Sequence, residues 1–161
     1  MRRGGSAKKR GRTFSSLLAQ IGRTLSWIIP MLVDTNVVSE LMRQRPSPTV
    51  VEWAGRQRRM RLSVVTVEEI LYGLGARRSP RLLRWFDTFV DRHCDVLDVT
   101  MVIARRCAAL RAALRAEGKP RTQADMLIAA TAIEHDVPLA TRNVRDFAGT
   151  GVAVIDPFRK A

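Results

Sequence analysis

Residues 31–40, MLVDTNVVSE, pass from an apolar strand pattern into a helix pattern, and Asp34 stands at the junction. The same alternation recurs along the chain. We expect further strands over 61–65, 94–99, 138–141 and 152–156, and helices over 35–44, 47–58, 67–76, 80–93, 101–117 and 124–136. Strands separated by helices predict a mainly parallel sheet covered on both faces, a three-layer α/β/α sandwich. Ligands bind such sheets beyond the carboxyl ends of the strands, which is where we expect Asp34.

Three further acids lie near junctions of the same kind. Glu69 falls in the first turn of a helix, Asp125 falls in the first turn of another, and Asp146 comes just after a late strand. A hard divalent cation such as Mg²⁺ takes oxygen ligands, and several carboxylates together can balance its charge. In a chain that is otherwise strongly basic, such acids indicate a metal site that faces a polyanion.

Each acid can also be explained as part of a helix cap. Asp34 precedes a helix, Thr66 and Glu69 have the spacing of a capping box, and Asp125 stands three residues after Thr122. Capping explains the acids singly, but it gives no common reason for all of them. Two interpretations therefore stay open: a metal-dependent enzyme, and a non-catalytic nucleic-acid-binding or regulatory module whose acids only cap helices.

Other side chains near these acids have simpler interpretations. Glu40 lies nearly two helical turns beyond Asp34, so it could point towards the site or lie on a solvated helix face, and we expect the solvated face. We expect Glu68, beside Glu69, to face outward. Tyr72, Trp85 and Phe86 have the spacing of core residues, so we expect them to be buried rather than to stack on bases.

The chain has 161 residues with 28 Lys and Arg and 15 Asp and Glu, a net charge of +13. Residues 1–30 hold seven of the basic residues and no acid. We expect residues 1–30 to be a flexible basic extension, or the product of an upstream start, and residues 31–161 to be one domain. Excess Lys and Arg favour phosphate backbones, although a solubilising surface is the simpler explanation.

Compartment and membrane association are also constrained by composition. No apolar run approaches 18 residues, so no transmembrane helix is expected. Cys94 and Cys107 lack the paired spacing of metal ligands, which favours reduced thiols and a cytoplasmic protein.

Four segments resemble the motifs of PIN-domain ribonucleases, above all the VapC toxins of bacterial toxin–antitoxin pairs. In chain order they are MLVDTNVVSELMR, TVEEILYG, ADMLIAATA and ATRNVRDF. The resemblance covers residues 31 to about 158. It implies a parallel sheet between helices and a nuclease that depends on Mg²⁺ or Mn²⁺ and cleaves RNA internally. It also implies a homodimer and inhibition by a cognate antitoxin protein.

The acidic set of this family maps onto Asp34, Glu69 and Asp125, with Asp34 and Asp125 as the expected metal ligands. The fourth position is open. Many relatives carry Asp directly after the Thr-Arg pair, where this chain has Asn143, and Asp146 lies three residues further on. Our hypothesis places Asp146 in the site. Arg142 and Asn143 are then either phosphate contacts or turn residues.

Overall fold

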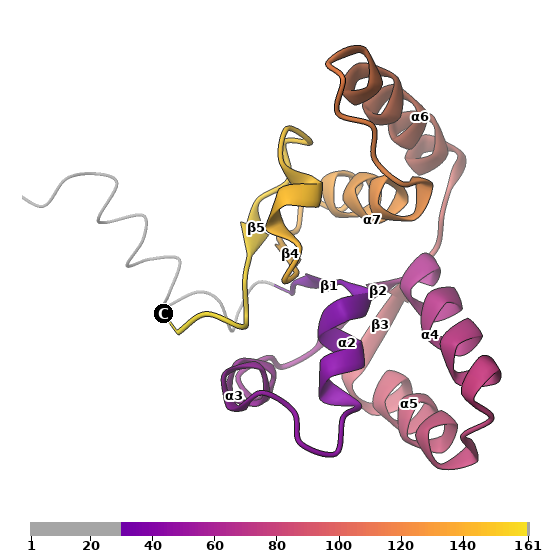
Figure 1. Ribbon diagram of the computed structural model, residues 1–161, viewed down its shortest axis with the longest axis vertical. Helices are drawn as coiled ribbons and strands as arrows, with labels where there is room; N and C mark the ends of the chain where they lie inside the picture. The colour runs from indigo at the N-terminus through magenta and orange to yellow at the C-terminus, as the bar shows by residue number, and fades with distance from the viewer. Residues whose placement is uncertain (1–29, 161) are drawn as a thin grey trace, which may run out of the picture.

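The computed structural model describes residues 30–160, so all but one residue of the predicted basic extension lies outside it. Within this range five strands form one parallel sheet in the order β3-β2-β1-β4-β5 (Figure 1). The strands are β1 (Leu32–Val33), β2 (Met60–Ser63), β3 (Cys94–Leu97), β4 (Leu139–Ala140) and β5 (Val154–Ile155). The predicted parallel α/β fold is therefore confirmed.

Helices cover both faces of this sheet. They are α2 (Thr35–Leu41), α3 (Pro48–Gly55), α4 (Val64–Arg77), α5 (Pro80–His93), α6 (Met101–Ala116), α7 (Gln123–Glu134) and the short 3₁₀ helix η1 (Val144–Phe147). Figure 1 shows α6 and α7 on one side of the strands and α2, α3 and α5 on the other, with α4 beside α2 and α5. The arrangement has the three layers that the sequence predicts.

Alternation along β1 divides the core into two clusters. Leu32 packs with α6 and α7, and the next residue, Val33, packs with α2, α3 and α5 on the opposite face. Both side chains are fully buried, as expected for a central strand covered on both faces. Burial of each such side chain stabilises the fold by about 1.5–3 kcal/mol.

The order of the strands places a topological switch point at β1. The chain passes from β1 to β2 and β3 on one side, and then returns to β4 on the other side of β1. The carboxyl ends of β1 and β4 therefore flank a crevice of the kind where open α/β sheets bind ligands. Asp34 follows β1 and Thr141 follows β4, and Asp34 N donates to Ala140 O at 3.0 Å.

The start of α4 differs from the prediction. The strand ends at Ser63 and not at residue 65, and Ser63, not Thr66, is the N-cap, with its hydroxyl accepting from Val65 N at 3.3 Å. Thr66 is instead buried inside the helix. The valines 64 and 65 suggested a strand, but a serine cap together with packing of Val65 outweighs their weak helix propensity.

The prediction of a solvated Glu40 is wrong. Its side chain is 7% exposed, accepts a hydrogen bond from Ser47 N at 2.8 Å and pairs with Arg43 at 3.2 Å. The carboxylate therefore satisfies a backbone donor in the loop between α2 and α3, which explains why an acid is buried there. Glu68 is exposed, as predicted.

Two of the three aromatic residues expected in the core lie on the surface. Phe86 is buried, as predicted, but Tyr72 is 77% exposed and Trp85 is 37% exposed. Trp85 stacks on Phe89 with ring centroids 5.0 Å apart, so it covers the edge of the core instead of entering it. Helical spacing alone could not separate the buried face from its border.

Both cysteines are free and buried, as expected for reduced thiols, and they lie in different core clusters. Burial raises the pKa of Cys94 to about 12. None of the helices in residues 30–160 has the length and apolar character needed to cross a bilayer.

Candidate functional site

Asp34 is the centre of the candidate site and is almost completely buried, with 4% of its surface exposed. Its Oδ1 accepts from Thr35 N at 2.7 Å, which makes it the N-cap of α2. Its Oδ2 accepts from Asn36 Nδ2 at 2.5 Å and from Thr141 Oγ1 at 2.6 Å. Three donors therefore fix the orientation of this carboxylate, and the predicted capping role of Asp34 is confirmed.

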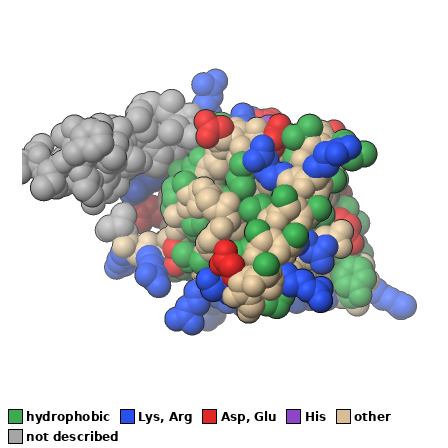
Figure 2. Space-filling view, turned by 90° about the horizontal axis from the view of Figure 1, so that it is seen from above, with side chains coloured by type: hydrophobic (Ala, Val, Ile, Leu, Met, Phe, Trp, Pro, Cys, Tyr) green, Lys and Arg blue, Asp and Glu red, His purple; other side chains and the backbone are tan. Residues whose placement is uncertain are grey.

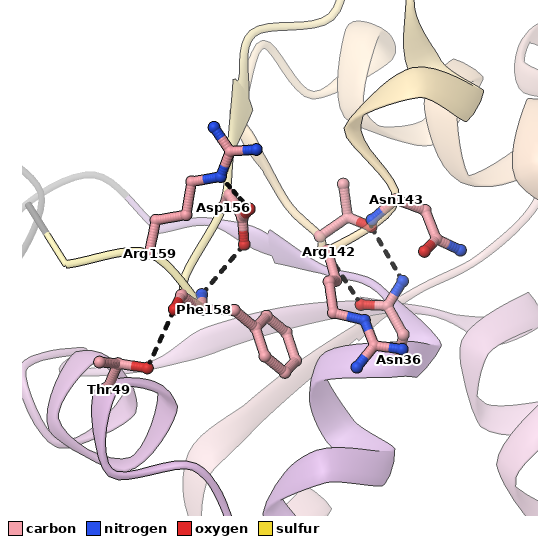
Figure 3. A network of polar contacts seen from close by, with 8 residues as sticks. Asn36, Thr49, Arg142, Asn143, Asp156, Phe158 and Arg159 are labelled. Atoms are coloured by element: carbon pink, nitrogen blue, oxygen red, sulfur yellow. Dashed lines mark hydrogen bonds and ion pairs between the residues drawn. The ribbon is translucent and has the colours of Figure 1, made fainter.

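The loop after β4 is tied to the first turn of α2 by the same group of side chains (Figure 3). Asn36 Nδ2 also reaches Thr141 Oγ1 at 2.9 Å, while Arg142 N donates to Asn36 Oδ1 at 3.1 Å. Asn143 N donates to Thr141 Oγ1 at 2.9 Å. Since Asn36 and Thr141 both contact Asp34, these bonds hold the two strand ends together around its carboxylate.

Glu69 joins this group through Thr35. The Thr35 hydroxyl donates to Glu69 Oε2, while the backbone N–H of Thr35 donates to Asp34. Because Ser63 caps α4, the predicted capping box between Thr66 and Glu69 does not exist. The half-buried Glu69 therefore faces α2 rather than its own helix terminus.

Asp125 combines capping with proximity to Asp34. Thr122 Oγ1 accepts from Asp125 N at 3.1 Å and donates to Asp125 Oδ2 at 2.5 Å, so the predicted cap at the start of α7 is confirmed. The charge of Asp125 nevertheless acts on Asp34, as does the charge of Glu69. The structure thus brings Asp34, Glu69 and Asp125 into one electrostatic group.

Asn143 is tied to the site through its backbone bond to Thr141, and Asp146 lies three residues further on in η1, but neither side chain has a hydrogen bond or ion pair with other residues in the range 30–160. Asp146 uses its backbone instead: its N–H donates to Asn143 O at 3.0 Å and its carbonyl accepts from Arg121 Nε at 3.0 Å. The hydrogen-bond pattern therefore does not choose between Asp146 and Asn143 as the fourth site residue.

The environment of Asp34 disfavours its negative charge. Burial raises the pKa of Asp34 from 3.8 to about 6, hydrogen bonds from Thr141 and Thr35 oppose this rise, and the charges of Asp125 and Glu69 add to it. None of the ion pairs formed by the described residues includes Asp34, Glu69 or Asp125. The group therefore carries negative charge that no Lys or Arg side chain balances by direct pairing.

The donor set fits a hard divalent cation. It consists of carboxylate oxygens, the ligands that Mg²⁺ and Mn²⁺ prefer, and its charge is uncompensated. In the described part of the chain, no three His, Cys, Asp or Glu side chains are close enough to bind one ion together. Mg²⁺ is usually held by one or two carboxylates and keeps several waters, so this spacing remains compatible with it.

Three site residues were not identified from the sequence as functional: Thr35, Asn36 and Thr141. Thr35 and Asn36 directly follow Asp34, and Thr141 ends the strand motif PLAT. Their positions in the fold could have identified them, because a polar residue at the carboxyl end of β1 or of the strand beside it faces the same crevice as Asp34. Knowing these positions required the strand order, which the sequence did not give.

Comparisons with known proteins identify the family and support the fold. The PIN domain family matches the chain over residues 31–152. A VapC ribonuclease, Y4jK, of Sinorhizobium fredii is 32% identical over 139 residues, which cover 81% of this chain and 99% of that protein. The crystal structure of FitAcB from Neisseria gonorrhoeae is 29% identical with a TM-score of 0.70, over 81% of this chain and 99% of that one. A toxin–antitoxin complex from Klebsiella pneumoniae is 25% identical with a TM-score of 0.64, over the same shares of the two chains.

Proposed function

The chain belongs to the PIN domain family, and from that premise we propose that it is a VapC-type toxin that cleaves RNA internally with the help of Mg²⁺ or Mn²⁺. One observation supports this most strongly. Asp34, Glu69 and Asp125 come from three separate parts of the fold, and the charges of Glu69 and Asp125 act on Asp34 beside the switch point of the sheet. None of the three pairs with a Lys or Arg among residues 30–160. Helix capping explains Asp34 and Asp125, but it does not explain Glu69.

We assign metal binding to Asp34 and Asp125. When bound, a divalent ion would supply the positive charge that activates a water and stabilises the phosphate oxygens as the phosphodiester bond breaks. Asp34 is held in place by Thr35, Asn36 and Thr141, so the chain would lose little side-chain entropy when a cation is bound.

We assign to Glu69 the orientation of the attacking water. Thr35 occupies Glu69 Oε2, and no hydrogen-bond donor in the described residues contacts Oε1, so this oxygen is available to accept a proton from a water. We place Asp146 as the fourth acid, with Asn143 as the alternative. Asn143 can offer an oxygen but cannot balance metal charge.

We propose RNA as the substrate, and the charge of the chain is compatible with a nucleic acid. The net charge is +13, and Lys and Arg side chains project at several points around the edge of the face drawn in Figure 2. Such charge offsets the repulsion between an acidic site and a phosphate backbone. The relatives support ribonuclease activity, since one is named a VapC ribonuclease.

We propose an antitoxin protein as the cellular partner and a homodimer as the working form, in the cytoplasm. The likeness to a toxin–antitoxin complex supports the first. Exposed apolar side chains, including Leu71, Tyr72 and Met101, supply surface that a second chain can cover. We further propose residues 31–161 as the nuclease domain.

The central experiment compares Asp34→Asn and Asp125→Asn with wild type in an RNA cleavage assay with Mg²⁺. Each substitution removes a charge needed for metal binding while keeping the side-chain shape, so we expect cleavage to be abolished and the circular dichroism spectrum to be preserved. Asp87→Asn is the matched control, because Asp87 is an exposed acid on α5 outside the site. Cleavage at near wild-type rate by either site variant would show that the site is wrongly assigned.

A further inference from the structure

A groove of about 430 Å³ opens at the carboxylate site and runs between α2, α4 and α5. Thr35 and Glu69 line the groove where it meets the site, and Arg43, Arg77 and Arg81 line it further along. We call this feature the arginine groove. Figure 1 shows its three helices side by side on one side of the sheet.

The face of α4 that lines the arginine groove carries Glu69, Gly73 and Arg77, which are four residues apart and therefore lie along one side of the helix. Arg77 lies about 12 Å beyond Glu69 along the helix axis, at 1.5 Å per residue. Between them, a Cβ added at Gly73 would meet nothing within 4 Å. A glycine inside a helix costs about 0.5–1 kcal/mol relative to alanine, yet here it keeps the floor of the groove open.

Arg77 and Arg81 are exposed and form no ion pair with any acid in residues 30–160. Arg43 differs, because it pairs with Glu40 at 3.2 Å. Arg77 stands in the last turn of α4, where the helix dipole favours a cation, but Arg81 stands in the first turn of α5, where the dipole disfavours one. Helix stability therefore does not account for Arg81.

We propose that the arginine groove binds the single-stranded RNA segment beside the cleaved phosphate, with Arg77 and Arg81 pairing with its backbone phosphates. A guanidinium group can donate two parallel hydrogen bonds to one phosphate. The guanidinium groups of Arg77 and Arg81, which pair with no acid in residues 30–160, line a groove that also includes Glu69. These contacts would draw a polyanion along α4 towards Glu69. The inference rests on the proposed function and names the side of the site on which the substrate lies.

The test measures binding of full-length protein to a short fluorescent oligouridylate in EDTA, where no metal supports cleavage, over a series of salt concentrations. Each phosphate contact on a single strand contributes about 0.7 to the slope of log affinity against log salt. We therefore expect the double variant Arg77→Ala/Arg81→Ala to lower the slope by about 1.4. Arg77→Lys/Arg81→Lys should keep most of the slope, because it keeps both charges.

The matched control is Arg105→Ala/Arg111→Ala, since both arginines are exposed on α6 and lie outside the groove. It removes the same net charge, and its slope should equal that of wild type. An equal loss in the control would mean that charge acts without a defined site and would overturn the proposal. An unchanged slope in the groove variant Arg77→Ala/Arg81→Ala would also overturn the proposal. If that variant keeps its slope with RNA but loses binding to polyglutamate, the groove binds a protein partner instead.

Cleavage with Mg²⁺ is measured separately on the same proteins. If wild type cleaves RNA while the groove variant keeps the full salt slope, the groove assignment fails and the proposed function stands. If the slope falls as expected but wild type cleaves no RNA, the proposed nuclease function fails and the groove assignment stands. Equal melting temperatures for the two Ala variants would exclude unfolding as the cause.

Discussion

Asp34→Asn should stabilise the metal-free protein at neutral pH and destabilise it in acid. In the folded state the pKa of Asp34 is about 6, against an ordinary value of 3.8, chiefly because the side chain is buried. A raised pKa means that the folded state favours the protonated carboxyl, so this contribution to stability is fully present below pH 3.8 and is lost as the pH rises through about 6. Above that range the ionised carboxylate opposes folding, and an amide would not.

The size of the effect follows from the same values. The rise in the pKa of Asp34 from 3.8 to about 6 corresponds to about 3 kcal/mol of unfolding free energy. The amide offsets part of this gain, because its NH₂ group would face the donors Asn36 Nδ2 and Thr141 Oγ1. Loss of one or two such bonds costs roughly 1–2 kcal/mol. The variant should therefore be about 1–2 kcal/mol more stable than wild type near pH 7.5, which raises the melting temperature by roughly 3–8 °C.

Denaturant unfolding in EDTA between pH 4 and pH 7.5 measures this difference directly. The stability of Asp34→Asn relative to wild type should rise through the interval from 3.8 to 6 and level off above it. Asp87→Asn should stay within about 0.5 kcal/mol of wild type throughout. Added Mg²⁺ should stabilise wild type at pH 7.5 and not Asp34→Asn. A difference that does not depend on pH would refute the reasoning.

Four further results are expected. Thr35→Val should lower the cleavage rate about tenfold by freeing Glu69, whereas Thr35→Ser should retain the rate, as single-turnover kinetics would show. Asp146→Ala should weaken metal binding and cut the rate substantially, so it should raise the Mg²⁺ concentration needed for half-maximal rate more than Asn143→Ala does; the opposite order would move the fourth site residue to position 143. Expression without a partner should arrest growth, and Asp34→Asn should relieve the arrest; harmless expression of the wild type would count against a toxin. A chain beginning at Met31 should fold and cleave RNA, with weaker binding at low salt after losing seven basic residues; an inactive truncation would show that residues 1–30 contribute to the domain.

Much of the fold was predictable because the order of strands and helices along the chain stays correct even when the predicted ends of the individual elements are wrong. β1 contains only Leu32 and Val33, although the pattern MLVD predicts a strand over residues 31–34, yet its position and direction were right. The parallel sheet then required Asp34 to lie at a carboxyl edge. What the sequence could not supply was strand order, and therefore the contact of Thr141 with Asp34, which joins residues 107 positions apart.

The errors at Ser63 and Glu40 have one physical cause. Both predictions used only the residues nearby in the sequence. In the structure, each side chain instead accepts a hydrogen bond from a backbone N–H that needs a partner: Ser63 accepts from Val65 N, and Glu40 accepts from Ser47 N. For Glu40 this demand outweighed the general preference of acids for water. Burial of an acid can therefore signal loop closure as readily as a functional site, which is why Glu40 does not extend the candidate metal site.

Capping and metal binding appeared from the sequence to be alternatives, but parallel topology makes them compatible. A helix that follows or precedes a parallel strand places its N-terminus at the carboxyl edge of the sheet, so caps of different helices converge there. Asp34 is the N-cap of α2, Asp125 hydrogen-bonds the N-cap Thr122 in the first turn of α7, and the charge of Asp125 acts on Asp34. A carboxylate has about four acceptor positions, and the three bonds to Asp34 leave one for a cation. The cap bond thus orients the carboxylate that we assign to the metal, so a single residue can serve the fold and the chemistry at once.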